Sequence, residues 1–138
     1  MRKMIQIAPT QVSAVWPRLR APMREIESPD GWIVEDVYFA LVSGAATLYL
    51  LEVDGKEVGF VVLRSLADFD GKRLHIWILY SRSDADVMAE FSDDLDAICR
   101  GIGASRITFG TTRRGWARVA PRYHFTVRET VYERKIKS

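Results

Sequence analysis

The chain has 138 residues, of which 48% are hydrophobic, and this content suits one core of two or three layers. We therefore expect a single domain over residues 1–138. A formal net charge of +2 is too small to indicate nucleic-acid binding by itself. The single cysteine, Cys99, excludes an internal disulfide bond, and we expect neither a signal peptide nor a membrane span, so the sequence predicts a cytoplasmic protein.

Residues 4–8 predict a short strand, and the residues from Pro9 to about position 27 predict a helix. Apolar residues recur along this helix at steps of three or four, which places them on one face. Pro17 and Pro22 each remove a backbone donor, so we expect the helix to be kinked or split into two short ones. The apolar face consists of Val12, Val15, Trp16, Leu19 and Met23.

A second helix and three antiparallel strands are expected next. Residues 33–43 have the helical period, and Gly44 follows them as a C-terminal glycine. The dipeptides Asp54-Gly55 and Asp70-Gly71 are typical of tight turns between strands. The strands that these turns join are predicted at residues 47–53, 57–66 and 74–80.

The stretch 74–110 predicts a βαβ unit. Ser83 stands where a helix N-cap is expected, and Asp86 completes the Ser-x-x-acid pattern that satisfies the first free amides of a helix. The helix should run to about residue 102, with a strand at 106–110 beyond it. Such a crossover makes its two strands parallel and right-handed. The apolar face of the helix consists of Val87, Phe91, Leu95, Ile98 and Ile102.

The last part of the chain predicts a short helix at residues 116–119 and a final strand at 126–136. Its charges are mostly basic over residues 113–137, whereas those over 84–96 are acidic. Because segments of opposite sign can steer like molecules together, we expect that the protein could form a homodimer.

This order of elements resembles the GCN5-related N-acetyltransferase (GNAT) fold over almost the whole chain. The resemblance implies an α/β (α+β) domain with a mixed sheet, mostly antiparallel with one central parallel pair, flanked by helices. In that family, a Gln/Arg-x-x-Gly-x-Gly turn follows the strand equivalent to 74–80, and its amides hold the pyrophosphate of acetyl-coenzyme A. By position alone, the residues implied to bind this cofactor are Ser81, Arg82, Ser83 and Asp86.

The chemical motifs of the family are absent from these positions. Ser83 takes the Gln/Arg position, and Asp86 and Met88 take the two glycine positions. Near the end of the chain, the family's Tyr-x-x-x-Gly-Phe pattern provides a tyrosine that protonates the departing thiolate. Here Ala120 takes the tyrosine position and His124 takes the glycine position. The resemblance therefore extends to the order of helices and strands, whereas the residues that bind the cofactor and protonate the thiolate in the family are replaced here.

Electrostatics also argue against a pyrophosphate at the turn 81–86. Asp84 and Asp86 place two carboxylates in the first turn of the expected helix. At an effective dielectric constant of about 20, two unit charges about 4 Å apart interact by roughly 4 kcal/mol, so Arg82 alone cannot outweigh both carboxylates. We therefore interpret Ser83 and Asp86 as helix caps.

A narrower resemblance comes from the block Arg114-Gly115-Trp116-Ala117-Arg118, together with Val15-Trp16-Pro17 upstream. It is similar to a group of small GNAT-fold proteins encoded in tailed-phage genomes, which share an Arg-Gly-Trp-x-Arg block and lack the glycine signature. This resemblance implies a phage or prophage protein, located in the host cytoplasm or in the virion, with phage structural proteins as partners.

Four residues are candidates for catalysis: His75, Glu52, Tyr123 and His124. His75 could act as a general base, or it could be a surface residue of a strand. Glu52 could be a base if burial raises its pKa, or it could mark an exposed strand end. Tyr123 and His124 lie near the family's acid without aligning with it. The two histidines and one cysteine are scattered, so no metal site is predicted.

An interaction surface is predicted at Arg113, Arg114, Trp116 and Arg118, where arginines could form cation–π contacts with the indole. Trp116 could instead pack under the sheet, and because it follows a strand directly we expect it to be mostly buried with Arg114 and Arg118 exposed. Gly115 is expected to adopt a backbone conformation that a side chain would hinder.

Three functions remain open. We favour a catalytically degenerate scaffold or virion-associated protein that works by association. The alternative is an acetyl-coenzyme A-dependent N-acyltransferase with a non-standard site between strands 74–80 and 106–110. Nucleic-acid binding through the basic C-terminal face ranks third, because few aromatic residues interleave with the arginines.

Overall fold

The computed structural model describes residues 1–26, 28, 30–82 and 86–137. A five-stranded sheet runs through the molecule in the order β1-β2-β3-β4-β5. Neighbouring strands are antiparallel except β4 and β5, which are parallel, so the predicted mixed sheet is confirmed. The strands are β1 (Arg2–Ile7), β2 (Thr47–Val53), β3 (Lys56–Asp68), β4 (Gly71–Ser81) and β5 (Ala104–Thr108).

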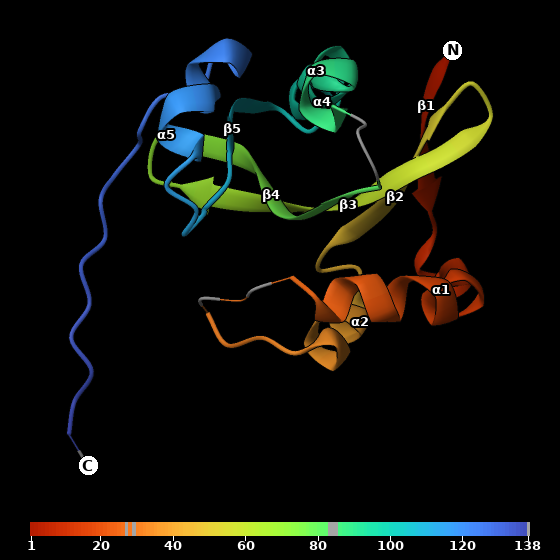
Figure 1. Cartoon of the computed structure of the whole chain (residues 1–138), viewed down its shortest axis with the longest axis horizontal. Coiled ribbons are helices and arrows are strands. Elements are labelled where there is room, and N and C mark those ends of the chain that lie inside the picture. Colours follow the sequence, from red (N-terminus) through yellow and green to blue (C-terminus); the bar gives the residue numbers. More distant parts are fainter. Residues whose placement is uncertain (27, 29, 83–85, 138) are drawn as a thin grey trace.

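Helices cover both faces of the sheet (Figure 1). The helices α1 and α2 lie on one face, α3 and α4 lie on the other, and α5 lies beside β5 (Figure 1). Among the described residues, no helix is long and apolar enough to cross a membrane. The helical elements are η1 (Pro9–Gln11), α1 (Val12–Arg24), α2 (Val34–Ser43), α3 (Val87–Glu90), α4 (Ser92–Gly101), α5 (Trp116–Val119) and η2 (Ala120–Tyr123).

The core has two parts because alternate residues of each strand point to opposite faces. On β3, Phe60 and Val62 pack with α1 and α2, whereas Val61 and Leu63 pack with α3 and α4. All four of these side chains are at most 3% exposed. Both sheet faces are therefore closed by helices, as a two-sided apolar sheet requires.

The turns agree with the sequence prediction. Asp54 and Gly55 have φ values of 52° and 78°, which is the left-handed pair that a two-residue hairpin needs. Gly44 ends α2 with φ of 83°, as a C-terminal glycine does. Tight turns thus join β2, β3 and β4, whereas α1 and α2 lie between β1 and β2, and α3 and α4 form the crossover from β4 to β5.

The helix predictions need two corrections. The first helix is not split at its prolines, since α1 continues through both Pro17 and Pro22 after the short turn η1. The carbonyl groups that lose a donor belong to Ser13 and Arg18, which lie on the exposed side of α1, so water can replace the missing bonds.

The crossover helix is two elements, α3 and α4, which meet at Phe91. The N-cap of α3 is Asp86, whose carboxylate accepts a hydrogen bond from the Ala89 amide at 3.2 Å. The predicted N-cap, Ser83, lies outside the described residues.

The predicted final strand at 126–136 is wrong. Residues 124–137 form neither helix nor strand and run away from the sheet in Figure 1. From Val127 on, the large apolar side chains of this segment are exposed: Val127, Val131, Tyr132 and Ile136. An alternating pattern indicates a strand only where a neighbouring strand supplies hydrogen bonds, and none of the described strands does so here.

Candidate cofactor site at the divergence of β4 and β5

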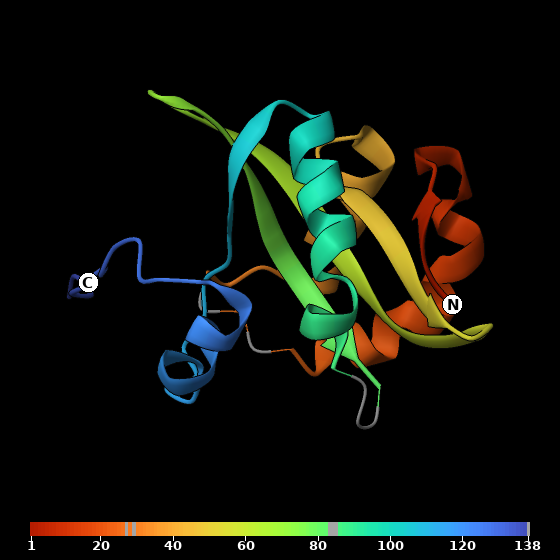
Figure 2. The same ribbon diagram turned by 90° about the horizontal axis from the view of Figure 1, so that it is seen from above.

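The strands β4 and β5 pair over a short length and then separate (Figure 2). Their last paired residues are His75 and Thr108, whereas β4 continues to Ser81. Just beyond that pair, the register of β4 against β3 shifts, so that Trp77 is an extra residue. Such a bulge bends and twists a strand, which accounts for the separation. The opening between β4 and β5 is the place where the resemblance implies the cofactor.

The first turn of α3 borders this opening and carries its own anion. Asp86 accepts a hydrogen bond from the Ala89 amide, so a carboxylate already occupies the start of α3. Met88, which takes the second glycine position of the family's turn, has a buried side chain. Because α3 has only one turn, its dipole offers little to a second anion.

Arg82 points away from this carboxylate. Its guanidinium donates to Glu57 at 2.9 Å, and Glu57 also pairs with Arg18 at 3.3 Å. The same guanidinium lies 5.6 Å from the ring centre of Tyr80. Four residues were assigned to the cofactor by position. Ser81 is the last residue of β4, Arg82 forms an ion pair with Glu57 of β3, and Asp86 caps α3. The fourth, Ser83, lies outside the described residues.

Tyr123 joins the two sides of the opening. Its hydroxyl donates to the Asp86 carboxylate, with oxygen distances of 3.0 Å and 2.9 Å. This hydrogen bond raises the pKa of Tyr123, and burial and the negative charge of Asp86 raise it further. The phenol is therefore a firm donor to Asp86 at neutral pH. It connects η2 to the start of α3.

Aromatic side chains that follow β5 form a cluster. Phe109 is the centre of this group, with ring centres 4.8 Å from Trp116 and 5.0 Å from Phe125. Trp116 also lies 6.3 Å from Tyr123. All four rings pack against the core on the α3 and α4 side. The expected packing of Trp116 against the sheet is thus present, with the indole partly buried.

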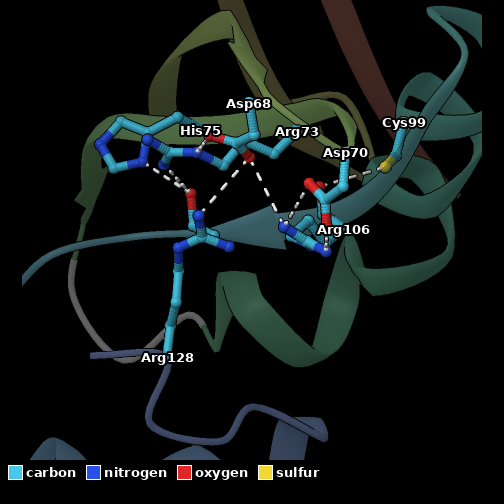
Figure 3. Close-up of polar contacts among 8 residues, drawn as sticks. Asp68, Asp70, Arg73, His75, Cys99, Arg106 and Arg128 are labelled. Atoms are coloured by element: carbon cyan, nitrogen blue, oxygen red, sulfur yellow. Dashed lines mark hydrogen bonds and ion pairs between the residues drawn. The ribbon is translucent and has the colours of Figure 1, made fainter.

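His75 makes a structural contact with β5 (Figure 3). Its Nδ1 lies 2.9 Å from the Thr108 hydroxyl, which also accepts a hydrogen bond from Arg73 at 2.8 Å. The hydroxyl proton is therefore free to be donated to a neutral imidazole. Burial lowers the pKa of His75, and the charges of Arg73 and Arg64 lower it further. This arrangement keeps the ring neutral and engages one of its two nitrogens.

The other catalytic candidates are not brought together with His75. Glu52 lies on β2, opposite Lys3 of β1, two strands away from β4. His124 is exposed and adopts a left-handed conformation with φ of 66° at the end of η2. Among the described residues, no group of three His, Cys, Asp or Glu side chains is close enough to hold a metal ion.

An arginine network near the hairpin of β3 and β4 was not anticipated from the sequence (Figure 3). Asp68 accepts from Arg73 at 3.1 Å, and its second oxygen lies 3.6 Å from Arg106 and 3.5 Å from Arg128. Arg106 also pairs with Asp70 at 2.8 Å. Arg106 and Arg128 are far along the chain from the hairpin that carries Asp68, Asp70 and Arg73, so no local pattern could have predicted their part in the network.

The arginines of the Arg-Gly-Trp-x-Arg block face solvent. Arg113, Arg114 and Arg118 are exposed, and the described cation–π pairs involve Trp77 and Tyr80 rather than Trp116. The expectation for Gly115 is wrong: its φ of −59° and ψ of −24° are ordinary helical values. A Cβ atom there would meet nothing within 4 Å, so this position does not require glycine.

The architecture is that of the GNAT acetyltransferases, an α/β fold with one parallel pair of strands in a mostly antiparallel sheet. No protein-family model matches the sequence, and no curated protein matches it. Solved structures match over the whole chain. A ribosomal-protein-alanine N-acetyltransferase from Brucella melitensis biovar Abortus 2308 has a TM-score of 0.70 at 16% identity, covering 99% of this chain and 100% of that one.

Two of the matching structures contain coenzyme A or its acetyl ester. The aminoglycoside N-acetyltransferase AAC(6')-Iy in complex with CoA has a TM-score of 0.71 at 14% identity, covering 100% of this chain and 96% of that one. A predicted acetyltransferase with acetyl-CoA from Clostridium acetobutylicum has a TM-score of 0.65 at 15% identity, covering 98% and 96%. At these identities the likeness extends to the fold alone.

Among the described residues, those at the start of α3 do not fit the pyrophosphate of acetyl-coenzyme A. A bound diphosphate needs free amides and positive charge, and the start of α3 presents the Asp86 carboxylate instead. Tyr123 donates to this carboxylate, and Arg82 is paired with Glu57.

Proposed function

We propose that this chain is a catalytically degenerate GNAT-fold protein of phage or prophage type, which works by association with other protein chains. One observation carries this proposal: Asp86 caps α3 and accepts the Tyr123 hydroxyl at 2.9 Å and 3.0 Å. By the alignment with the family, Asp86 takes the position of a glycine in the pyrophosphate turn, so this contact supports the view that a carboxylate has replaced the cofactor's anion.

The energetic argument is one of charge. A diphosphate within about 4 Å of the Asp86 carboxylate would be opposed by roughly 4 kcal/mol per charge pair at an effective dielectric constant of about 20. Binding would also break the hydrogen bonds from Tyr123 and leave its hydroxyl to water. Arg82 could compensate only by leaving Glu57, whose other partner is Arg18 at 3.3 Å.

Calorimetric titration with acetyl-coenzyme A tests the loss of the cofactor site. We expect no heat of binding at millimolar ligand with the unaltered chain. Binding at micromolar concentrations, weakened by Arg82→Ala, would contradict the proposal. The variant Asp86→Asn should increase affinity if the carboxylate is what excludes the ligand.

A matched control is Asp36→Asn. Asp36 also accepts a helix-start amide, that of Ile33 at 2.9 Å, but it belongs to α2 on the opposite face of the sheet. This variant removes a negative charge from the first turn of another helix and keeps an acceptor oxygen, without touching the start of α3. It should therefore bind acetyl-coenzyme A no better than the unaltered chain.

The association part of the proposal rests on surfaces outside the opening. Arg113, Arg114 and Arg118 are exposed around a partly buried Trp116, and the same block is what the chain shares with the phage group. If the protein is a virion component, particles purified on a density gradient from cells that produce it should contain it in a fixed ratio to the major coat protein. Its recovery only in the unassembled fractions would contradict this role.

The second candidate is an acetyl-coenzyme A-dependent N-acyltransferase with a non-standard site. It is favoured by the separation of β4 and β5 beyond His75 and Thr108, which leaves an opening of the kind the fold uses for its thioester. Acetylation of amine substrates by the purified chain, abolished by Tyr123→Phe, would favour this function over the first.

A further inference from the structure

The helices α1 and α2 pack together on the face of the sheet opposite α3 and α4 (Figure 1). An open groove of about 280 Å³ lies between them. Pockets that enclose small molecules usually measure about 300–1,000 Å³, so this groove is better suited to an extended chain that lies across it. Its lining consists of Ser13, Trp16, Pro17 and Arg20 from α1 with Glu35 and Tyr38 from α2.

Two aromatic rings line the groove. The rings of Trp16 and Tyr38 meet edge to face, with their centres 5.0 Å apart and their planes at 64°. Both side chains are partly buried and pack against the core. Apolar surface continues along α2, where Phe39 is 70% exposed and Val42 is 38% exposed. Val42 lies three residues after Phe39 and four after Tyr38, so its side chain adjoins both of theirs on the outer side of the helix.

The polar ends of the two lining rings are available as hydrogen-bond donors. Among the residues that the structure describes, neither the Trp16 indole N–H nor the Tyr38 hydroxyl takes part in a hydrogen bond. The buried side-chain polar atoms that lack a partner in that part of the chain belong to Asp68 and Arg82. The two ring donors are therefore open to solvent. A ligand that matches them presents apolar surface together with hydrogen-bond acceptors.

The charges at the groove are already paired. Arg20 of α1 and Glu35 of α2 form an ion pair at 2.9 Å. A backbone hydrogen bond lowers the pKa of Glu35, and the hydrogen bond from Arg20 lowers it further, so the carboxylate is ionised at neutral pH. An ionic ligand would have to compete with this pair, whereas an uncharged ligand leaves it intact.

We propose that the groove between α1 and α2 binds a proline-rich segment of another protein in the polyproline II conformation. Proline has no backbone N–H, and this conformation has no internal hydrogen bonds, so such a segment offers carbonyl acceptors to the two ring donors. Its proline rings supply the uncharged apolar surface, and grooves lined by aromatic side chains are a known way to bind such segments.

The length of the apolar surface agrees with this ligand. From Glu35 to Val42, α2 rises by about 10 Å at about 1.5 Å per residue. One turn of polyproline II rises by about 9 Å over three residues. Two prolines spaced three residues apart would therefore both lie on the surface formed by Trp16, Tyr38 and Phe39.

Other occupants fit the groove less well. The five prolines of this chain are at positions 9, 17, 22, 29 and 121, and no two of them are three residues apart, so a second copy does not supply the segment. An amphipathic helix uses its carbonyl groups internally and would leave the indole and phenol donors to water. The ligand is therefore an extended segment of a different protein.

This proposal rests on the association part of the proposed function, and it names the chemistry of the partner. The two can fail separately, because acetyl-coenzyme A reports on the start of α3 and a proline-rich peptide reports on the opposite face of the sheet. A chain that is present in purified particles but binds no such peptide would contradict the groove proposal and leave the proposed function intact.

Calorimetric titration of the full chain with a decaproline peptide tests the groove. We expect saturable binding, and no heat from a glycine–serine peptide of equal length. Tyr38→Phe keeps the ring and removes the hydroxyl, so it should weaken binding about fivefold, the factor that one hydrogen bond contributes. The matched control is Tyr132→Phe, the same change at a residue that is 90% exposed in the tail. No saturable binding at millimolar peptide, or an affinity that Tyr38→Phe lowers no more than Tyr132→Phe does, would overturn the proposal.

Sedimentation tests whether a second copy covers this face instead. We expect Phe39→Asp to weaken the binding of decaproline and to leave the sedimentation of the chain unchanged. A dimer that Phe39→Asp disrupts and decaproline does not would show that another copy occupies the groove, and would overturn the proposal.

Nuclear magnetic resonance of the indole groups locates the bound peptide. The chain has four tryptophans, and Trp16→Phe identifies the Trp16 signal by its loss. On addition of decaproline, the Trp16 indole N–H signal should shift because it gains a carbonyl acceptor, while the Trp116 signal stays unchanged. Trp32 and Trp77 form a competing aromatic pair, with ring centres 6.1 Å apart. Shifts of their signals without a shift at Trp16 would place the peptide elsewhere and overturn the proposal.

Discussion

The sheet with its four main helices and the segment from Phe109 onward are built in different ways. Within the described residues, every buried hydrophobic side chain lies between Val12 and Cys99, and residues 109–137 contain none. The first region closes both faces of the sheet, whereas the second touches the molecule along the open side of β4 and β5. The comparison teaches that the fully buried core lies before β5, whereas the C-terminal segment adds partly buried aromatic rings at its beginning and an exposed tail after them.

The largest expected loss of stability follows a substitution in the sheet and its four main helices. Phe60 is 0% exposed and stacks on Tyr80 with ring centres 5.2 Å apart. Phe60→Ala should lower the free energy of unfolding by about 3–5 kcal/mol, because it removes a large buried ring and leaves a cavity. Urea unfolding followed by circular dichroism measures this. The control Phe39→Ala removes an exposed ring, and an equal loss there would mean that burial does not explain the difference.

Replacing Trp116 measures how much the segment from Phe109 onward contributes to stability. Its indole is partly buried against Phe109, so Trp116→Ala should cost about 2 kcal/mol, less than the value for a fully buried ring. The same unfolding experiment applies, with the exposed Arg114→Ala as a control. If Trp116→Ala cost as much as Phe60→Ala, the C-terminal segment would belong to the core and the contrast between the regions would fail.

Two glycines, one in each region, extend the comparison to the conformation of the backbone. Gly103 has φ of 76° between α4 and β5, whereas Gly115 has φ of −59°. Gly103→Ala should therefore destabilise the protein by about 1–2 kcal/mol, and Gly115→Ala should be neutral or stabilising by about 0.4–1 kcal/mol. Thermal melts of the two variants should move in different directions. A loss of stability in Gly115→Ala would indicate a close contact made by this block in an assembly.

The smallest expected effect concerns pH. Burial lowers the pKa of His75 below its ordinary value of 6.5, so the unfolded chain binds a proton more readily than the folded one. Stability should be fully present above pH 6.5 and should fall as the pH falls from 6.5 toward the lower pKa of the folded protein. His75→Gln should flatten this part of the profile, measured by urea unfolding at a series of pH values. The exposed His124→Gln is the control, and an equal flattening there would refute the assignment to His75.

Sequence patterns were reliable where neighbouring residues decide the structure. The hairpin at Asp54-Gly55, the C-terminal glycine of α2 and the parallel pair of β4 and β5 follow from turn chemistry and from the length of the crossover. The candidate site was predicted in part: the sequence indicated a carboxylate in the first turn of the crossover helix, three residues after the expected cap Ser83, whereas Asp86 is itself the N-cap of α3.

Other features depended on contacts between distant parts of the chain. The hydrogen bonds from Tyr123 to Asp86 join residues 37 apart, and the network around Asp68 brings together arginines from β4, β5 and the tail. No spacing signals such pairs, because their formation depends on how the sheet twists and where β5 ends. The separation of β4 and β5 has the same origin, since the bulge at Trp77 appears only when β4 is aligned with β3.

The sequence by itself determined the class of fold and the absence of the glycine signature, because both are properties of local order and composition. Only the tertiary structure decided the fate of the tail and of Gly115. The tail has strand propensity, but a strand requires a partner that supplies hydrogen bonds, and one copy of the chain leaves β5 unpaired. Gly115 was expected to adopt a backbone conformation that a side chain would hinder, but as the N-cap of α5 it has ordinary helical φ and ψ values. The strand propensity of a segment depends on its own residues, whereas strand pairing and burial depend on which other parts of the folded protein lie beside it.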